Sequence, residues 1–335
     1  GLGNIKITGL YKKDGFSFSH TYTPKNGIHT LVEAIGVYEQ VSPECVLVTT
    51  GASLGLLSAL CMLPKNSVVL CPFPYYAGYP SMIRNVGLQL KFYYLDEENN
   101  WEIEVDQLLR ESNSVVSAIL LNLPGNPAGN TCSSGKLQTI LDVANSRHIK
   151  VISDEVYADL SYKKKEVTCK PYINEKTAVI VKSFSKLFML AGERIGYIIA
   201  HPDLIRELTK IHWSLAMSAP AYGQFRALQL LQQSKQTIVS ALMNELTKNR
   251  TMAHELLVSS PFISSKKPDA GIFYWIKIDK PVEEIKQIHA SLNHNGVIVT
   301  PGHVFGEKFN QYMRINFAVD AFELKEGLHQ LLSLL

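Results

Sequence analysis

The sequence lacks several features that would assign it to common functional classes. A surplus of one charge is absent, because 33 Lys and Arg residues are balanced by 30 Asp and Glu residues, a net charge of +3. Binding to nucleic acid or to an anionic membrane surface requires a clustered basic face, so neither partner is expected. No apolar run approaches the ~20 residues that cross a bilayer. The chain begins at Gly1 without Met and shows no signal peptide, so we expect a processed or truncated N-terminus.

Paired cysteines are also missing. The five cysteines are odd in number, scattered, and include no CxxC pair. They therefore predict neither a disulfide framework nor a metal site, and they are typical of a reduced, cytoplasmic protein. The sequence has no GxGxxG after a strand and no GxxxxGK[ST] loop. Neither a NAD-dependent dehydrogenase nor a P-loop enzyme is expected.

Length and hydrophobic content favour two lobes with a large core, since the chain has 335 residues and is 46% hydrophobic. Short apolar runs alternate with helical patterns in the first part of the chain. Strands are expected at 46–50, 68–71, 91–95, 117–121, 150–153, 178–182 and 195–200. Runs that are apolar throughout are typical of strands covered on both faces, as in a mainly parallel α/β sheet. A long helical stretch from Tyr222 to about Val258 then leads to an α+β lobe with strands at 271–278, 297–300 and 312–318.

The strongest chemical signal is the segment from Val181 to Tyr197. Lys186 follows a strand and lies among serines and aromatic residues. A lysine in an apolar pocket is driven toward its neutral amine, the form that makes Schiff bases. Arg194, eight residues later, offers a planar fork suited to phosphate. An ordinary surface Lys–Arg pair is the alternative.

Further polar residues stand where predicted strands end. Asp154 comes directly after the 150–153 strand, and ligands of open α/β sheets bind at such carboxyl ends. A carboxylate there could keep a pyridinium nitrogen protonated while Tyr157 donates to a phenolate. The alternatives are that Asp154 caps the following helix and that Tyr157 packs in the core. Asn126 follows the 117–121 strand. It is either part of a simple turn or a buried residue whose side-chain amide holds an oxygen atom of a ring.

Two strand-to-helix junctions complete the set. The turn Thr50–Ser53 offers free amides and a hydroxyl at a helix start, which together form a phosphate cradle. The segment Pro72–Tyr79 carries aromatic residues that could stack on a planar ring, although core packing is their usual role.

In this order, the motifs resemble those of the class I/II aminotransferases, the fold-type I enzymes that use pyridoxal 5′-phosphate. The resemblance covers the chain from about Tyr22 to Arg314. It implies an α/β fold with a mainly parallel seven-stranded sheet, helices on both faces and a smaller α+β domain. The large cofactor-binding domain would comprise residues 24–240, and the small domain residues 1–23 and 241–335.

The resemblance also implies a role for each matching residue. Lys186 would form the Schiff base and then move a proton, Asp154 would pair with the pyridine nitrogen, and Tyr76 would stack on the ring. The implied cofactor-binding residues are Ala52, Ser53, Tyr76, Asn126, Asp154, Tyr157, Ser183, Ser185, Lys186, Arg194 and Tyr22. Arg314, with Asn126, would bind the substrate α-carboxylate. The Asn126–Pro127 peptide bond is a candidate cis bond. Tyr22 would reach the phosphate of a neighbouring subunit, which implies a homodimer with shared active sites.

The predicted function is therefore a pyridoxal-phosphate-dependent aminotransferase that moves an amino group from an L-amino acid to a 2-oxo acid. A β-lyase, an amino-acid synthase or cyclase, and a catalytically silent binding protein of the same fold are the alternatives. The family's N-terminal arm is expected to be short or missing. Residues 213–220 contain no arginine, where aspartate aminotransferases bind a second carboxylate. Arg84 and His212 are the candidate substitutes, and Tyr75, Tyr76, Tyr79 and Trp213 favour a non-acidic donor.

Overall fold

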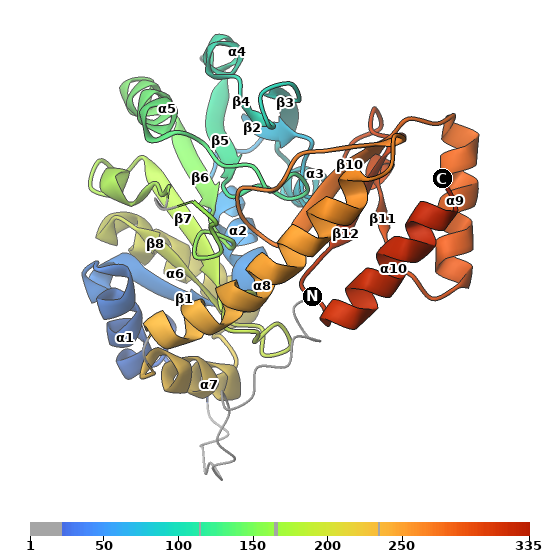
Figure 1. Ribbon diagram of the computed structural model, residues 1–335. Coiled ribbons are helices and arrows are strands. Elements are labelled where there is room, and N and C mark those ends of the chain that lie inside the picture. Colours follow the sequence, from blue (N-terminus) through green and yellow to red (C-terminus); the bar gives the residue numbers. More distant parts are fainter. Residues whose placement is uncertain (1–21, 114, 164–166, 234) are drawn as a thin grey trace.

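The computed structural model describes residues 22–113, 115–163, 167–233 and 235–335. Two sheets of different size organise this part of the chain (Figure 1). The predicted assignment of residues 1–21 to the small domain lies outside the described residues, and the predicted division at residue 240 falls within a helix, α8 (Lys235–Val258). The division into domains therefore stays a prediction.

The first sheet is mainly parallel, as predicted. Its order is β1 (Val46–Thr49), β8 (Gly196–Ala200), β7 (Ala178–Ser183), β6 (Lys150–Asp154), β5 (Val116–Asn122), β2 (Val68–Phe73), β3 (Gln89–Asp96) and β4 (Glu102–Ile103). Strands β7, β6, β5, β2 and β3 pair in parallel, whereas β8 runs antiparallel to both of its neighbours. The sheet has eight strands where seven were expected, because the two-residue β4 extends its edge beyond β3.

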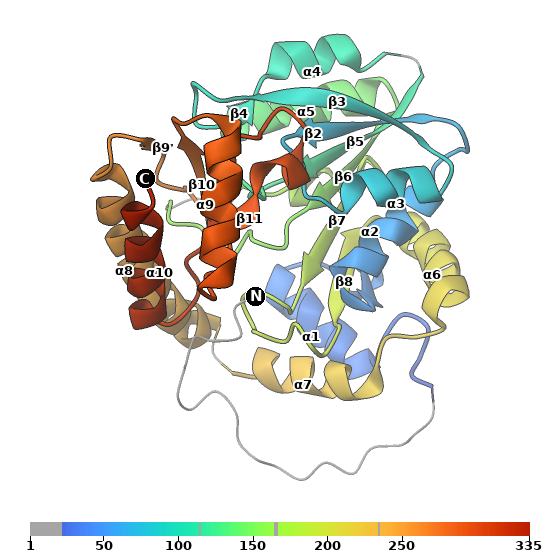
Figure 2. The ribbon, with the colours of Figure 1, turned by 90° about the vertical axis from the view of Figure 1, so that its right-hand side faces the viewer.

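Helices cover both faces of this sheet, which explains why its strands are apolar throughout. Successive strand residues point to opposite faces: Val46 and Val48 lie in one core cluster, and Leu47 lies in the other. The first face is covered by α1 (His29–Glu39), α4 (Val105–Glu111), α5 (Ser134–Ser146) and α7 (Ala221–Leu231). The second is covered by α2 (Gly51–Cys61), α3 (Tyr79–Asn85) and α6 (Pro202–Ala216) (Figure 2).

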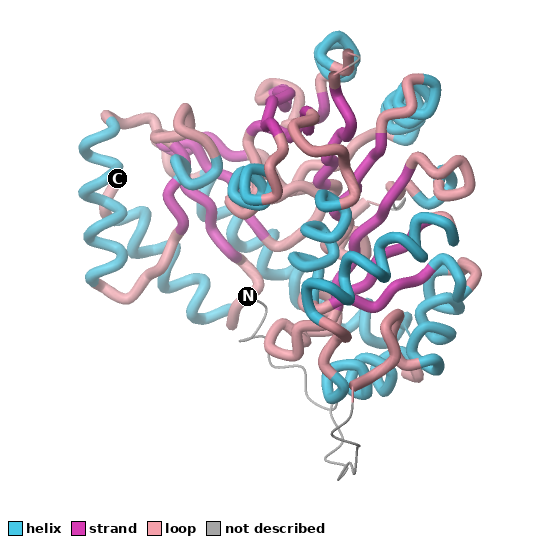
Figure 3. Tube along the Cα trace, turned by 180° about the vertical axis from the view of Figure 1, so that it is seen from behind, coloured by secondary structure: helices cyan, strands magenta, loops and turns pink. Residues whose placement is uncertain are grey.

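The second sheet is antiparallel and smaller. Its order is β11 (Thr300–Pro301), β12 (Tyr312–Asn316), β10 (Phe273–Ile278) and β9 (Ile263–Ser265). With α8, α9 (Val282–His294) and α10 (Ala321–Ser333), it lies to one side of the first sheet (Figure 3). An aromatic cluster joins the two sheets: Phe73 and Trp101 pack against Phe309, which contacts Trp275. The second sheet is thereby fixed against the carboxyl end of β2.

Two predicted elements differ from the structure. The long helical stretch is two helices, α7 and α8, separated at Gln232 and Gln233. The strand predicted at 297–300 is reduced to β11, because only Thr300 and Pro301 pair with β12. No helix of the described residues is both long enough and apolar enough to cross a membrane.

Candidate active site

Polar residues gather at one edge of the first sheet. The register pairs Asn122 with Asp154, and Asp154 with Val181, so β5, β6 and β7 end together. Because β8 is antiparallel, its beginning lies at the same edge, where Ser183 pairs with Gly196. The topology therefore brings Arg194, just before β8, toward the carboxyl ends of the parallel strands.

A cavity of about 220 Å³ opens at this edge. Its lining contains ten of the residues predicted from the sequence: Ala52, Ser53, Tyr76, Asn126, Asp154, Tyr157, Ser183, Ser185, Lys186 and Arg194. Leu56, Asn122, Val156 and Ala191 complete it. Residues from four strand ends and two helix starts thus form a single site.

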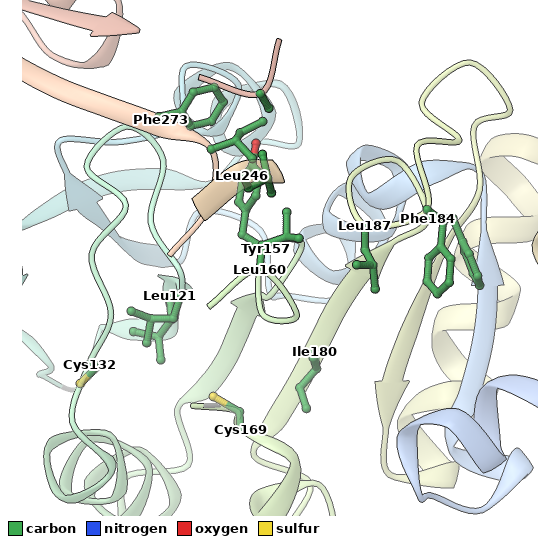
Figure 4. Packing of buried hydrophobic residues seen from close by; sticks show 14 of the residues in the cluster. Leu121, Cys132, Tyr157, Leu160, Cys169, Ile180, Phe184, Leu187, Leu246 and Phe273 are labelled. Atoms are coloured by element: carbon green, nitrogen blue, oxygen red, sulfur yellow. The ribbon is translucent and has the colours of Figure 1, made fainter. Parts of the chain in front are cut away.

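The surroundings of Lys186 favour the neutral form of its amine. Its Nζ lies 5.7 Å from the ring centroid of Tyr157. Burial lowers the pKa of Lys186, and the positive charges of Arg314 and Arg194 lower it further, while Asp154 opposes them. The Tyr157 ring packs against Phe273 of β10, with centroids 5.8 Å apart (Figure 4). Burial also raises the pKa of Tyr157 well above its usual value, so its hydroxyl stays a proton donor.

Asp154 is a buried carboxylate held by two donors. The Tyr79 hydroxyl donates to its Oδ2 at 2.7 Å, and the Val156 amide donates to its Oδ1 at 3.3 Å. Burial raises the pKa of Asp154 to about 6, although these hydrogen bonds and Lys186 act against it. No helix follows β6 directly, so the alternative role of Asp154 as a helix cap is not realised.

Asn126 is oriented by a residue that the sequence analysis did not single out. The backbone N–H of Asn126 donates to Oδ1 of Asn122 at 2.8 Å, so the end of β5 holds the following loop. The Asn126–Pro127 bond is cis, as predicted. The side chain of Asn126 then points its Oδ1 at Arg314, whose Nη1 donates to it at 2.9 Å.

Arg314 extends from the second sheet to Asn126, although it does not itself line the cavity. Its Nη2 donates to the Thr300 hydroxyl at 3.1 Å, and its guanidinium carbon lies 4.0 Å from the Phe273 ring centroid and 5.0 Å from that of Phe305. Its Nε is buried and has no hydrogen-bond partner among the described residues. The guanidinium is therefore fixed in place by an aromatic pair while part of its donor capacity remains unused.

The part of the cavity formed by the start of α2, its α2 end, is suited to an anion. Ser53 and Ala52 lie in the first turn of α2, and helix starts favour negative charge. Gly51 has φ of +69°, and a Cβ there would come within 2.6 Å of the Arg194 guanidinium. Glycine thus lets Arg194 lie directly against the helix start. The Ser183 hydroxyl accepts from the Ser185 amide at 3.0 Å, which fixes the turn leading to Lys186.

Several predicted residues lie elsewhere. Tyr22 is 77% exposed and does not line the cavity. Of the four aromatic residues expected to surround a donor, only Tyr76 lines it. Tyr75 stacks on Phe92, and Trp213 lies on the surface of α6 beneath Lys25.

The two candidate substitutes for a second arginine also lie outside the cavity lining. Arg84 is exposed on α3, and His212 is buried behind the start of α2. Among the described residues, no group of three His, Cys, Asp or Glu side chains could hold a metal ion.

Comparisons with known proteins agree with this geometry. The profile of the family "Aminotransferase class I and II" matches residues 15–331. The chain is 27% identical to an aspartate aminotransferase of Pyrococcus horikoshii, over 92% of this chain and 82% of that protein. It is 26% identical to an asparagine–oxo-acid transaminase of Streptococcus mutans, with the same coverage.

Solved structures show the same fold. An aspartate aminotransferase of Thermus thermophilus with maleate superposes with a TM-score of 0.87 at 22% identity, covering 94% of this chain and 84% of that one. An N-succinyldiaminopimelate aminotransferase of Mycobacterium tuberculosis gives a TM-score of 0.87 at 23% identity, covering 94% of this chain and 86% of that one.

Proposed function

The chain belongs to the class I and II aminotransferase family, and we propose that the cavity beside Lys186 holds pyridoxal 5′-phosphate. The protein is an aminotransferase, which moves an amino group from an amino acid to a 2-oxo acid. The observation that carries the proposal is the shared cavity, where Lys186, Asp154 and the anion-binding residues of α2 and Arg194 meet.

The residues present fit this cofactor chemically. A phosphate needs amides, hydroxyls and a cation, and the α2 end of the cavity supplies all three through Ala52, Ser53 and Arg194. A protonated ring nitrogen needs a carboxylate, and Asp154 is buried in the lining with neutral donors as its hydrogen-bond partners. Tyr76 offers a ring face for stacking, and Asn126 and Tyr157 offer donors for a phenolic oxygen.

Bound pyridoxal 5′-phosphate supplies an electron sink for the substrate carbon that loses its proton. Within the chain, Lys186 is the residue that would move the proton in this step. Its lowered pKa favours the neutral amine, which can take a proton from the substrate Cα and return it to another atom. The carboxylate of Asp154 would pair with the ring nitrogen and favour its protonated form.

Arg314 provides the contact for the substrate carboxylate. Its Nη1 donates to Asn126, which lines the cavity, and a guanidinium binds a carboxylate with two parallel hydrogen bonds. Phe273 and Phe305 exclude water from its faces, which strengthens these bonds. Substrates with an α-carboxylate, both amino acids and 2-oxo acids, satisfy this arrangement.

Transamination is favoured over elimination or synthase chemistry by the relatives, which are named as aminotransferases. The residues around Lys186 serve all of these reactions, so the reaction is distinguished by products. Keto acid and a new amino acid indicate transamination, whereas ammonia released from one substrate indicates elimination. Because residues 213–220 carry no arginine, we expect donors without a second carboxylate to react faster than aspartate.

An assembly and a location for the protein are also proposed. We propose a homodimer in which Tyr22, exposed in one chain, reaches the phosphate of the partner's site. The five cysteines are all unpaired and four are buried, which supports a reducing compartment such as the cytoplasm.

The proposal is tested by substituting Lys186. Purified protein incubated with pyridoxal 5′-phosphate should show the visible absorbance of a lysine-bound cofactor, and Lys186→Ala should lose it together with all transamination. Lys182→Ala would be a poor control, because Lys182 forms a buried ion pair with Glu39. Lys210→Ala on α6 is a suitable surface control. Wild-type protein that binds no cofactor would overturn the proposal.

A further inference from the structure

His212 occupies a position on α6 that should be apolar. It follows Leu204 and Leu208 at four-residue intervals, and all three side chains face the core between α6 and the first sheet. His212 has no exposed surface. A buried polar side chain is costly unless it is hydrogen-bonded, so the contact that it makes calls for an explanation.

That contact lies at the start of α2. The Thr50 amide donates to Nε2 of His212 at 3.1 Å, and Thr50 is the residue directly before the helix. An accepting Nε2 carries no proton, so the ring is the neutral tautomer with its proton on Nδ1. Burial lowers the pKa of His212, which favours the same neutral form. Nδ1 itself has no partner among the described residues.

The turn held in this way is the one that leads into the cavity. On its other side, the Thr49 hydroxyl donates to the Gly51 carbonyl at 3.0 Å. The next two residues, Ala52 and Ser53, line the cavity at its anion-binding end. Gly51 has a positive φ, and glycine adopts this region and many others readily, so its own backbone does not fix the turn. Thr49 and His212 hold the turn from the strand and from α6.

We infer that His212 is a positioning residue for the cofactor phosphate: it accepts the Thr50 amide and so orients the start of α2. This inference rests on the proposed cofactor. His212 does not touch the cavity, and its effect passes through Thr50 to the amides and the hydroxyl of the first turn. A side chain that only filled space would support pyridoxal and pyridoxal 5′-phosphate equally.

Three variants separate these roles. His212→Leu keeps the volume and removes the acceptor, whereas His212→Gln keeps an acceptor oxygen. Thr50→Pro removes the donor from the other partner, and the Thr50 φ of −74° suits proline. The measurement is the dissociation constant of each ligand-free variant for pyridoxal 5′-phosphate, for pyridoxal and for inorganic phosphate, followed by absorbance and by competition.

We expect His212→Leu and Thr50→Pro each to weaken binding of pyridoxal 5′-phosphate and of inorganic phosphate about tenfold, as for loss of one well-placed hydrogen bond. Pyridoxal, which has no phosphate, should bind each variant as it binds wild type, and His212→Gln should stay within about threefold of wild type. The double variant should be little worse than either single one, because both remove the same bond.

Equal weakening of pyridoxal and pyridoxal 5′-phosphate would overturn the inference, as would unchanged phosphate binding in His212→Leu. Should His212→Leu fail to fold, Thr50→Pro decides the question alone by the same ligand comparison. Failure of wild-type protein to bind pyridoxal 5′-phosphate would instead overturn the proposed function, so the two failures are distinguishable.

Discussion

The Tyr79 hydroxyl and the Asp154 carboxylate form a buried hydrogen bond of 2.7 Å. Tyr79 has no exposed surface and Asp154 has 4%. Tyr79 lies at the start of α3, three residues after the cavity-lining Tyr76. Tyr79 does not line the cavity, and its hydrogen bond favours the charged carboxylate that burial disfavours.

Removing the Tyr79 hydroxyl should weaken cofactor binding through its effect on Asp154. In Tyr79→Phe the pKa of Asp154, already raised to about 6, should rise by roughly one further unit, since a hydrogen bond to a charged group contributes about 1.5–3 kcal/mol. The carboxylate form is lost as the pH falls through that pKa. Binding of pyridoxal 5′-phosphate, titrated between pH 5 and 8, should therefore fail at a higher pH in the variant.

Tyr93→Phe is the matched control for Tyr79→Phe. Tyr93 is also fully buried, and its hydroxyl donates to the Leu120 carbonyl at 3.0 Å, away from Asp154. It should lose stability without moving the pH dependence of cofactor binding. Identical pH profiles for Tyr79→Phe and wild type would contradict a role for this hydrogen bond.

The buried Asp154 should also destabilise the ligand-free protein at neutral pH. Its pKa is raised from 3.8 to about 6 in the fold, so the folded state binds a proton before the unfolded state does as the pH falls. The resulting decrease in the free energy of unfolding is complete above pH 6 and disappears toward pH 4. Between these values it changes by about 1.4 kcal/mol per pH unit. Asp154→Asn removes the charge. The variant should be more stable than wild type at pH 8, by up to about 3 kcal/mol, and should lose this advantage by pH 4–5 in urea denaturation.

Much of the cavity could be predicted because strand ends carry a strong signal. The apolar runs before Asn122, Asp154 and Ser183 identify buried parallel strands, and such strands place their carboxyl ends at one edge. Asn126, Asp154 and Ser183, which end or follow these runs, are therefore candidates from the sequence alone, whereas Asn122 is not. The match of motif order to a known family then supplied the individual roles.

Residues that act through pairing between distant segments could not be predicted. Thr300 contacts Arg314 because β11 and β12 place these residues opposite each other, and no local pattern encodes that register. His212 was considered for substrate binding because it is a histidine near the expected loop. Its burial on α6 follows from helix packing, and only the fold reveals that it faces Thr50.

The Thr300 hydroxyl should matter for substrate affinity more than for turnover. Thr300→Val keeps the shape and removes the oxygen that accepts from Nη2 of Arg314. We expect KM for both the amino acid and the 2-oxo acid to rise about 3–10-fold with kcat little changed, as for loss of one hydrogen bond. Thr300→Ser, which keeps the oxygen, is the control. An equal fall in kcat would place Thr300 in the chemical step instead.

Arg314→Lys should have a larger effect on the same parameter. A lysine cannot make the two parallel hydrogen bonds of a guanidinium or reproduce its planar contacts with Phe273 and Phe305. The KM for α-carboxylate substrates should rise by about a hundredfold or more, as for loss of a charge-assisted bidentate contact. Cofactor absorbance should persist. Unchanged KM would remove Arg314 from the substrate site.

The exposed Tyr22 provides a test of shared active sites. If Tyr22 binds the phosphate in the partner's cavity, Tyr22→Phe should weaken affinity for pyridoxal 5′-phosphate about tenfold, as for a hydrogen bond to a charged group. Lys186→Ala should be inactive but should still present its own Tyr22 to a partner.

Mixing the two variants distinguishes a contact across subunits from one within the chain. In a hybrid dimer, the cavity with an intact Lys186 receives Tyr22 from the Lys186→Ala chain and is complete. The other cavity carries both defects. A refolded mixture should therefore regain activity at low cofactor concentration with wild-type affinity. If Tyr22 acts within its own chain, every active cavity in the mixture lacks its hydroxyl and binds cofactor as Tyr22→Phe does. A protein that is monomeric in solution while fully active would exclude the shared site altogether.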